Sequence, residues 1–196
     1  MGRIFCIMGK SASGKDTVYR RVLEAEPSLG TCVMYTTRPI REGEIPGETY
    51  HYVKEEELAA FRVAGRLIES RTYDTVYGPW TYATVDDGSI RLSERDYLFP
   101  GTLESYRRLK AYFGEENVVP LYIEVEDGER LRRALLREMK EEKPKYREVC
   151  RRFLADCEDF SEEKLAEAGI VRRFANTELE SCVAAVLEEI RKNEKL

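Results

Sequence analysis

The stretch "GKSASGKDTV", residues 9–18, limits the possible folds of this chain more than any other segment. Gly9, Gly14 and Lys15 have the spacing of the G-x-x-x-x-G-K-[ST] phosphate-binding loop, in which glycines let backbone N–H groups approach phosphates closely. An apolar run rich in β-formers, residues 3–8, precedes the loop, and an amphipathic helical pattern follows it. A strand, a glycine loop and a helix in this order predict a nucleotide-binding α/β fold.

The residue after Lys15 is Asp16, where the pattern has a Ser or Thr that holds magnesium. One interpretation is a helix-start carboxylate, favoured by the helix dipole by about 0.3–1 kcal/mol. The other is a Mg²⁺ ligand, direct or through water, since magnesium prefers oxygen ligands. Thr17 is the nearest hydroxyl and either replaces the missing ligand or supports Asp16. Ser11 and Ser13 complete the loop that we expect to bind ATP.

Composition excludes several classes of protein. A chain of 196 residues with a net charge of -5 predicts one soluble domain whose surface is not that of a nucleic-acid binder. The five cysteines include no C-x-x-C pair, which favours free thiols in a reducing cytoplasm over a disulfide framework. No apolar stretch approaches 18 residues, so we expect no membrane span.

The pattern of elements predicts a mostly parallel sheet flanked by helices. We expect one domain over residues 1–196, with a core of residues 1–34 and 90–196. A small β-rich lobe is expected at about 35–89, and a mobile helical lid at about 137–148. The expected strands are 3–8, 31–37, 50–53, 96–100, 118–125 and 169–176, with a small antiparallel sheet over 67–85; the expected helices are 15–27, 54–65, 102–113, 127–158 with a break near Pro144, and 178–192.

A second polar site is predicted in "YTTRPIREGEIPGETYHYV", residues 35–53. Arg38 and Arg41 place two guanidinium groups on a short loop, and arginine pairs bidentately with phosphate. Tyr50 and Tyr77 offer phenolic hydroxyls to the same phosphate. The alternative interpretation is a solvated charged loop with tyrosines in the core.

Together with the glycine loop, this second stretch resembles the guanylate kinases almost letter for letter. The resemblance extends more weakly to "ANTEL" near residue 176 and so covers nearly the whole chain. It implies a P-loop kinase fold with an inserted acceptor-binding lobe and a helical lid. It also implies transfer of the ATP γ-phosphoryl group to GMP or dGMP with Mg²⁺, by a monomer or homodimer that binds neither nucleic acid nor membranes.

The resemblance further assigns roles to single residues. Arg38, Arg41, Tyr50 and Tyr77 fall on the ligands of the acceptor phosphate, and Glu69 falls on the carboxylate that accepts from N1 and N2 of guanine. Arg137 and Arg152 fall near the lid and helix arginines that neutralise the transferring phosphoryl group, although a charged exterior helix face would look the same. Asn176 falls on the residue near the donor adenine.

The sequence departs from the guanylate kinase pattern at the base and at the magnesium site. Met34 replaces a serine that contacts the base, and Thr81 is the nearest replacement for a hydroxyl that follows the Tyr77 motif. Phe99 and Gly101 stand where the family has two aspartates. A magnesium carboxylate that has moved to Asp16 is therefore a coherent hypothesis, with Glu104 as a second candidate.

Two other functions remain open at this point. Ribose 1,5-bisphosphate phosphokinases also carry "GSGKD" and lack the paired aspartates, but they lack the complete stretch over residues 35–53. Non-catalytic guanylate kinase-like binding modules reuse the acceptor lobe, but they tend to lose the glycine loop that this chain retains. The sequence therefore favours a guanylate kinase-like phosphotransferase.

Overall fold

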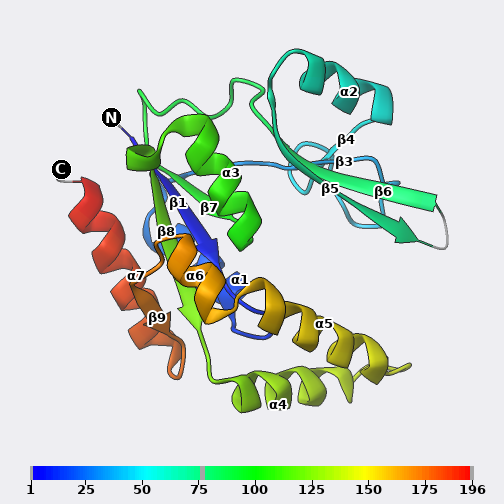
Figure 1. Cartoon of the computed structure of the whole chain (residues 1–196), viewed down its shortest axis with the longest axis vertical. Coiled ribbons are helices and arrows are strands. Elements are labelled where there is room, and N and C mark those ends of the chain that lie inside the picture. The colour runs from blue at the N-terminus through cyan, green and yellow to red at the C-terminus, as the bar shows by residue number, and fades with distance from the viewer. Residues whose placement is uncertain (1, 76–77, 195–196) are drawn as a thin grey trace.

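A computed structural model describes residues 2–75 and 78–194. It contains a parallel sheet of five strands in the order β2-β7-β1-β8-β9 and a separate sheet of four strands in the order β4-β3-β6-β5. Figure 1 shows the smaller sheet at one end of the molecule and the helical pair α4 and α5 at another. The α/β fold with a parallel sheet, flanking helices and an inserted β-rich region is thus confirmed.

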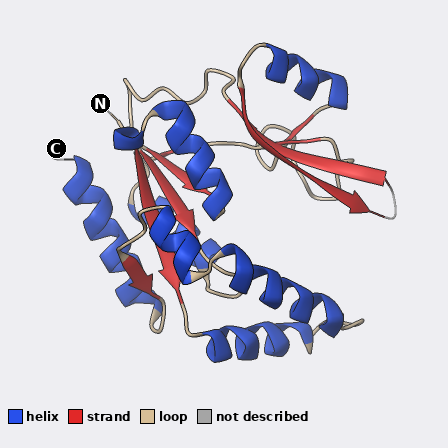
Figure 2. Cartoon of the chain, in the orientation of Figure 1, coloured by secondary structure: helices blue, strands red, loops and turns tan. Residues whose placement is uncertain are grey.

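Helices follow β1, β7, β8 and β9 of the parallel sheet, as the sequence pattern indicates, whereas β2, β3 and β4 follow one another directly, as do β5, β6 and β7 (Figure 2). The strands are β1 Ile4–Met8, β2 Gly30–Thr31, β3 Tyr35–Thr36, β4 His51–Tyr52, β5 Leu67–Thr75, β6 Gly78–Val85, β7 Tyr97–Pro100, β8 Val118–Glu124 and β9 Arg173–Ala175. The helices are α1 Lys15–Ala25, α2 Glu55–Val63, α3 Leu103–Phe113, the 3-10 turn Glu115–Asn117, α4 Asp127–Glu138, α5 Tyr146–Asp159, α6 Glu162–Glu167 and α7 Leu179–Glu194.

Strand β1 lies at the centre of the parallel sheet and is fully buried. Ile4, Cys6 and Met8 pack on one face with α3 and the α6 region, while Phe5 and Ile7 pack on the other face with α1 and α7. A continuous apolar run is what a parallel strand covered on both faces requires. The carboxyl end of β1 leads directly into the glycine loop, so the loop lies at the edge of the sheet where α/β proteins bind ligands.

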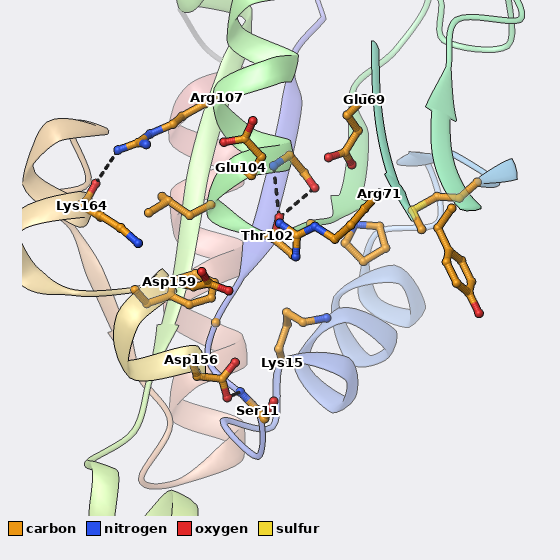
Figure 3. Close-up of a pocket in the computed structure, with 18 of the residues that line it drawn as sticks. Ser11, Lys15, Glu69, Arg71, Thr102, Glu104, Arg107, Asp156, Asp159 and Lys164 are labelled. Atoms are coloured by element: carbon orange, nitrogen blue, oxygen red, sulfur yellow. Dashed lines mark hydrogen bonds between the residues drawn. The ribbon is translucent and has the colours of Figure 1, made fainter. Parts of the chain in front are cut away.

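The smaller sheet has its own core. Tyr35, Ala83 and Val85 pack with Leu58 of α2 on one face of this sheet. The other face carries the side chains that point toward the parallel sheet, among them Glu69 and Arg71 (Figure 3). The inserted sheet therefore presents one apolar face to its helix and one polar face to the rest of the protein.

Two expectations about the elements were wrong. The single strand expected at 31–37 is divided into β2 and β3, which belong to different sheets, because the chain passes from the core to the lobe between them. Helix α6 was not expected; Ser161 begins it, with its Oγ accepting the Lys164 N–H at 3.3 Å, and Glu162 and Glu163 occupy its first turn. Within the described residues, no helix is both long and apolar enough to cross a membrane.

Candidate active site

The glycine loop follows β1 and turns into α1 at Gly14, whose φ of 82° is left-handed. A Cβ atom at Gly14 would lie 2.4 Å from Nδ2 of Asn176, and one at Gly9 would lie 2.6 Å from the carbonyl oxygen of Ile123. Real Cβ atoms do not approach other atoms this closely. Both glycines are therefore required by the backbone path, as the motif predicts.

A cavity of about 330 Å³ lies along this loop and is lined by residues 9–17 together with Arg137. Ser13 is buried, and its Oγ has no hydrogen-bond partner among the residues that the structure describes. The ammonium group of Lys15 lies 2.6 Å from Oδ1 of Asp16, whose side chain is 88% exposed. A cation, an orphan hydroxyl and a helix N-terminus around one cavity are suited to phosphate oxygens.

Asn176 packs against the glycine loop and fixes its backbone by a hydrogen bond. Its Nδ2 donates to the Ser13 carbonyl at 2.8 Å, and its backbone N–H donates to the carbonyl of Glu124 at 2.8 Å. Its own carbonyl accepts from Arg133 of α4 at 3.1 Å. The side chain that the resemblance associates with the donor adenine thus also fixes the loop backbone, and its role toward adenine stays a prediction.

Side chains of helices α4 and α5 also hydrogen-bond to the backbone of this loop. The carboxylate of Asp156 accepts the Ser11 N–H at 2.8 Å, and Arg130 donates to the Ser11 carbonyl at 3.0 Å. Arg130 is 1% exposed and also donates to Oδ1 of Asp127 at 2.7 and 3.0 Å. Asp127 in turn pairs with Lys10 of the loop at 3.2 Å. No sequence motif signals this network, since it joins the loop to residues more than one hundred positions further along the chain.

A larger cavity of about 610 Å³ lies between the inserted sheet and the helices α3 and α5 (Figure 3). Gly9, Ser11 and Lys15 line both cavities, so the two spaces adjoin at this part of the glycine loop, from which Lys15 extends. Met34 and Glu69 line the larger cavity, as the resemblance predicts for base-contacting residues. Oε1 of Glu69 accepts from the Thr84 hydroxyl at 3.1 Å. The structure also brings here several polar residues that the sequence analysis did not single out: Arg71, Tyr73, Tyr82, Arg107, Asp156, Asp159 and Lys164.

The surroundings of Phe99 and Gly101 show why aspartates would not fit at these two positions. Phe99 is buried in the core of the parallel sheet. Gly101 lines the larger cavity, but a Cβ there would lie 2.8 Å from Sγ of Cys6. Within the described residues no group of three or more His, Cys, Asp and Glu side chains is placed to hold a metal ion. Glu104 lines the larger cavity and pairs with Arg108 at 2.8 Å.

Arg38 is buried on the inserted sheet and forms an ion pair with Glu44, with Nη1 at 2.8 Å from Oε2. Its guanidinium lies 5.2 Å from the ring centre of Tyr50 and 5.6 Å from that of Tyr52. The hydrogen bond from Arg38 is the main reason why the pKa of Glu44 is lowered to about 2. Arg38 and Tyr50 thus form one cluster, although neither lines the larger cavity.

The other residues predicted for the acceptor and the lid are more scattered. Arg41 is exposed and lies 5.9 Å from the Trp80 ring centre, and Tyr77 lies outside the described residues. Thr81 is not brought to the cavity: it pairs with Thr72 in the hairpin, and its hydroxyl lies 3.2 Å from Glu55 of α2. Arg137 lines the smaller cavity, whereas Arg152 is exposed on α5, pairs with Glu148 at 2.8 Å and lines neither cavity.

Arg71 was missed although a signal was present. In "LIESRTYDT" a strand period of two places Glu69, Arg71 and Tyr73 on one face. Since Glu69 was already expected to face the acceptor, the same alternation would have placed Arg71 beside it.

Comparison with known proteins agrees with this arrangement. A family model described as guanylate kinase matches residues 1–151. A guanylate kinase of Chromobacterium violaceum is 31% identical over 101 residues, which are 50% of this chain and 48% of that protein. One of Nitratidesulfovibrio vulgaris is 34% identical over 111 residues, or 56% and 52% of the two chains. This chain thus spans about half the length of the curated relatives it matches.

The fold comparison extends further along the chain. The crystal structure of guanylate kinase from Anaplasma phagocytophilum superposes with a TM-score of 0.61 over 97% of this chain and 85% of that chain, at 21% sequence identity. That likeness shows the fold. The family model carries the assignment, because it covers the glycine loop, the inserted sheet and α4, and on this evidence the chain belongs to the guanylate kinase family.

Proposed function

We propose that this protein transfers the γ-phosphoryl group of ATP to the phosphate of GMP or dGMP, giving ADP and the nucleoside diphosphate. The observation that carries the proposal is the meeting of the two cavities at Lys15, with the glycine loop on one side and Glu69 on the other. A donor phosphate chain in the smaller cavity and an acceptor in the larger one would then approach each other beside one ammonium group. Family membership and the names of the matched relatives support the same reaction.

The donor would be held by the loop N–H groups, the Ser13 hydroxyl and Lys15, with Arg137 neutralising charge. An acceptor phosphate oxygen attacks the γ-phosphorus, the bond to the β–γ bridging oxygen breaks, and ADP leaves with that electron pair. Because the attacking oxygen is already ionised, no side-chain base is required. The catalytic contribution of the protein is therefore positioning and charge neutralisation.

The acceptor phosphate would be held by Arg38, Arg41 and Tyr50, with Tyr77 and Arg152 as further predicted contributors. Glu44 orients the Arg38 guanidinium through their ion pair, and the guanidinium would donate to the acceptor phosphate. Met34 and Glu69 would contact the base. The predicted contact of Thr81 with the base has no support from its position in the hairpin.

Magnesium would be held by Asp16, with Thr17 beside it. Magnesium is commonly bound by one or two protein carboxylates together with substrate phosphates and waters, so a single exposed carboxylate next to the phosphate cavity fits this need. When bound, the ion would neutralise charge on the phosphates of ATP. We propose it as the cofactor on the chemistry of these oxygen donors.

We also propose how the chain is organised. It would work as one domain with the core at 1–34 and 90–196, the acceptor lobe at about 35–89 and the lid at about 137–148, where α4 ends and α5 begins. Closure of lobe and lid would exclude water from the reacting phosphates. The five cysteines are free thiols, namely Cys6, Cys32, Cys150, Cys157 and Cys182. Free thiols support a reducing compartment such as the cytoplasm.

The test is ADP release from ATP and Mg²⁺ with a panel of acceptors: GMP, dGMP, AMP, UMP and ribose 1,5-bisphosphate. We expect turnover with GMP and dGMP. Glu69→Gln should reduce use of GMP strongly, while it would hardly change the use of a sugar acceptor. Turnover of the sugar alone would overturn the proposal, and failure to bind ATP at all would indicate a binding module.

A further inference from the structure

The cavity face of the β5–β6 hairpin carries an acceptor group and a donor group side by side. Glu69 pairs in register with Thr84, and Arg71 pairs with Tyr82, so these four side chains share one face of the sheet. Glu69, Arg71 and Tyr82 all line the larger cavity. In Figure 3 both Glu69 and Arg71 extend from the inserted sheet into the space above Lys15.

The two charged groups offer complementary hydrogen bonding. The Glu69 carboxylate only accepts, and its Oε1 is engaged by the Thr84 hydroxyl, which leaves Oε2 for a ligand. Arg71 is exposed, and its planar guanidinium offers five N–H donors. One of these donors is engaged in a hydrogen bond with the Tyr73 side chain. Glu69 and Arg71 are two positions apart on the strand, so a rise of about 3.3 Å per residue places their Cα atoms about 6.6 Å apart.

Guanine presents the matching pattern. Its N1–H and N2–H groups donate on one edge, and its O6 and N7 atoms accept on the adjoining edge. Arginine binding to O6 and N7 is the commonest specific contact to guanine in protein–nucleic acid complexes, because the guanidinium fork matches both acceptors. A base whose N1 and N2 donate to Glu69 would therefore turn O6 and N7 toward the neighbouring side of the cavity wall.

Three other residues of the cavity are less suited to supply these donors. Met34 offers no side-chain hydrogen-bond donor. Arg107 is engaged with the Lys164 carbonyl and with Glu167, both at 3.1 Å. Lys15 belongs to the glycine loop at the junction with the smaller cavity. Arg71 is the lobe cation that lies on the same strand as Glu69.

We infer that Arg71 is a specificity-determining residue that donates to O6 and N7 of the guanine base. The inference rests on the proposed function, and it identifies a polar group that recognises the base in a chain with Met34, Phe99 and Gly101 at the positions that depart from the family pattern. It also predicts discrimination against adenine, whose 6-amino group would place a donor against the guanidinium.

The experiment compares kcat/KM of the wild-type protein and Arg71→Met for four acceptors. These are GMP, its 7-deaza analogue without the N7 acceptor, the 2-aminopurine ribonucleotide without O6, and IMP without the 2-amino group. In the wild type, loss of O6 should lower kcat/KM about 5- to 150-fold. Arg71→Met should show the same loss with GMP and with IMP, and a smaller loss with the nucleotides that lack O6 or N7, because each of these offers only one of the two acceptors. Because the 2-aminopurine nucleotide also lacks N1–H, the ratio of variant to wild type for each acceptor is the quantity that decides.

The controls separate recognition from folding. Arg71→Lys should recover part of the activity with GMP, because one ammonium can still donate to O6. Arg62→Met, on the exposed end of α2, removes an arginine of the lobe that lines neither cavity and should leave all four values unchanged. The KM for ATP should be the same in every variant.

Two outcomes would overturn the inference, and they are distinguishable. If Arg71→Met loses the same factor with GMP and with the nucleotides lacking O6 or N7, then Arg71 contacts another part of the acceptor, such as its phosphate. If the wild type turns over GMP and also turns over the 7-deaza and 2-aminopurine nucleotides with the same kcat/KM, then no protein donor binds O6 or N7. If the wild type does not turn over GMP, the proposed function and this inference fail together.

Discussion

The buried guanidinium of Arg130 should be essential to the stability of the glycine loop. Arg130 is 1% exposed, and its Nε and Nη2 donate to Oδ1 of Asp127 at 3.0 and 2.7 Å. Its Nη1 donates to the Ser11 carbonyl at 3.0 Å, and its Cζ lies 4.8 Å from the ring centre of Phe153. The perturbation is Arg130→Met, which keeps most of the side-chain volume and removes every donor.

The expected cost follows from what the substitution leaves behind. Removing one partner of a buried ion pair costs about 3–5 kcal/mol, and leaving a buried carbonyl without its donor costs about 1–3 kcal/mol. The Asp127 side chain is 45% exposed and keeps Lys10, so water and that ammonium reduce the first contribution. We therefore expect a loss of about 3 kcal/mol in the free energy of unfolding. For a protein of this size that corresponds to a Tm lowered by roughly 6–12 °C.

The assay is urea unfolding followed by circular dichroism, together with a thermal scan. Arg132→Met is the matched control, because Arg132 lies on the same helix and forms the same i,i+3 pair with Glu129, but its side chain is 62% exposed. Exposed pairs contribute about 0–1 kcal/mol, so this control should hardly change stability. A loss below about 1 kcal/mol for Arg130→Met, or equal losses for the two variants, would refute the reasoning.

Three further predictions concern the loop and the lobe. Gly14→Ala and Gly43→Ala both place a Cβ atom on a residue with φ 82°, but only the Cβ at position 14 meets another atom, Nδ2 of Asn176 at 2.4 Å, while the one at position 43 meets no atom within 4 Å. Only Gly14→Ala should therefore weaken ATP binding, by tenfold or more in a calorimetric titration, which is on the order of 1.4 kcal/mol. Asp16→Ala should lose most phosphoryl transfer at saturating Mg²⁺ with Asp16→Ser recovering part of it, and activity like that of the wild type in Asp16→Ala would remove Asp16 as the ligand. Because Arg38 holds the folded-state pKa of Glu44 near 2, below its ordinary 4.5, the pair stabilises the protein fully above pH 4.5 and loses that effect as the pH falls through 2. Glu44→Gln should therefore be less stable than the wild type at pH 7, by an amount that shrinks steadily as the pH falls from 4.5 toward 2, and a constant difference would contradict this.

The glycine loop and the elements around it were predictable because their signals are local. An apolar strand, close-approach glycines and an amphipathic helix occur within residues 3–25, and the structure places them as expected. The division of 31–37 between two sheets was not predictable, because a short apolar run does not reveal which partner strand it pairs with.

The site itself was predictable only in part. Glu69 and Met34 reach the larger cavity as the family pattern implies. Thr81 does not, because the register of the β5–β6 hairpin pairs it with Thr72 on the face toward α2. A shift of one residue would move every side chain of the strand to the other face, and no sequence signal marks this register. The Arg130 network joins segments more than one hundred residues apart, so only the folded chain reveals it.

The most direct test of the proposed reaction is to follow the γ-phosphoryl group itself. ATP labelled with ³²P at the γ-position is incubated with the protein, Mg²⁺ and an equimolar mixture of GMP, AMP and ribose 1,5-bisphosphate, and the products are separated. The glycine loop and the cavity lined by Glu69 meet at Lys15, and the proposed reaction there predicts that the label appears in GDP. Label in the sugar product, or in inorganic phosphate alone, would contradict the proposed reaction.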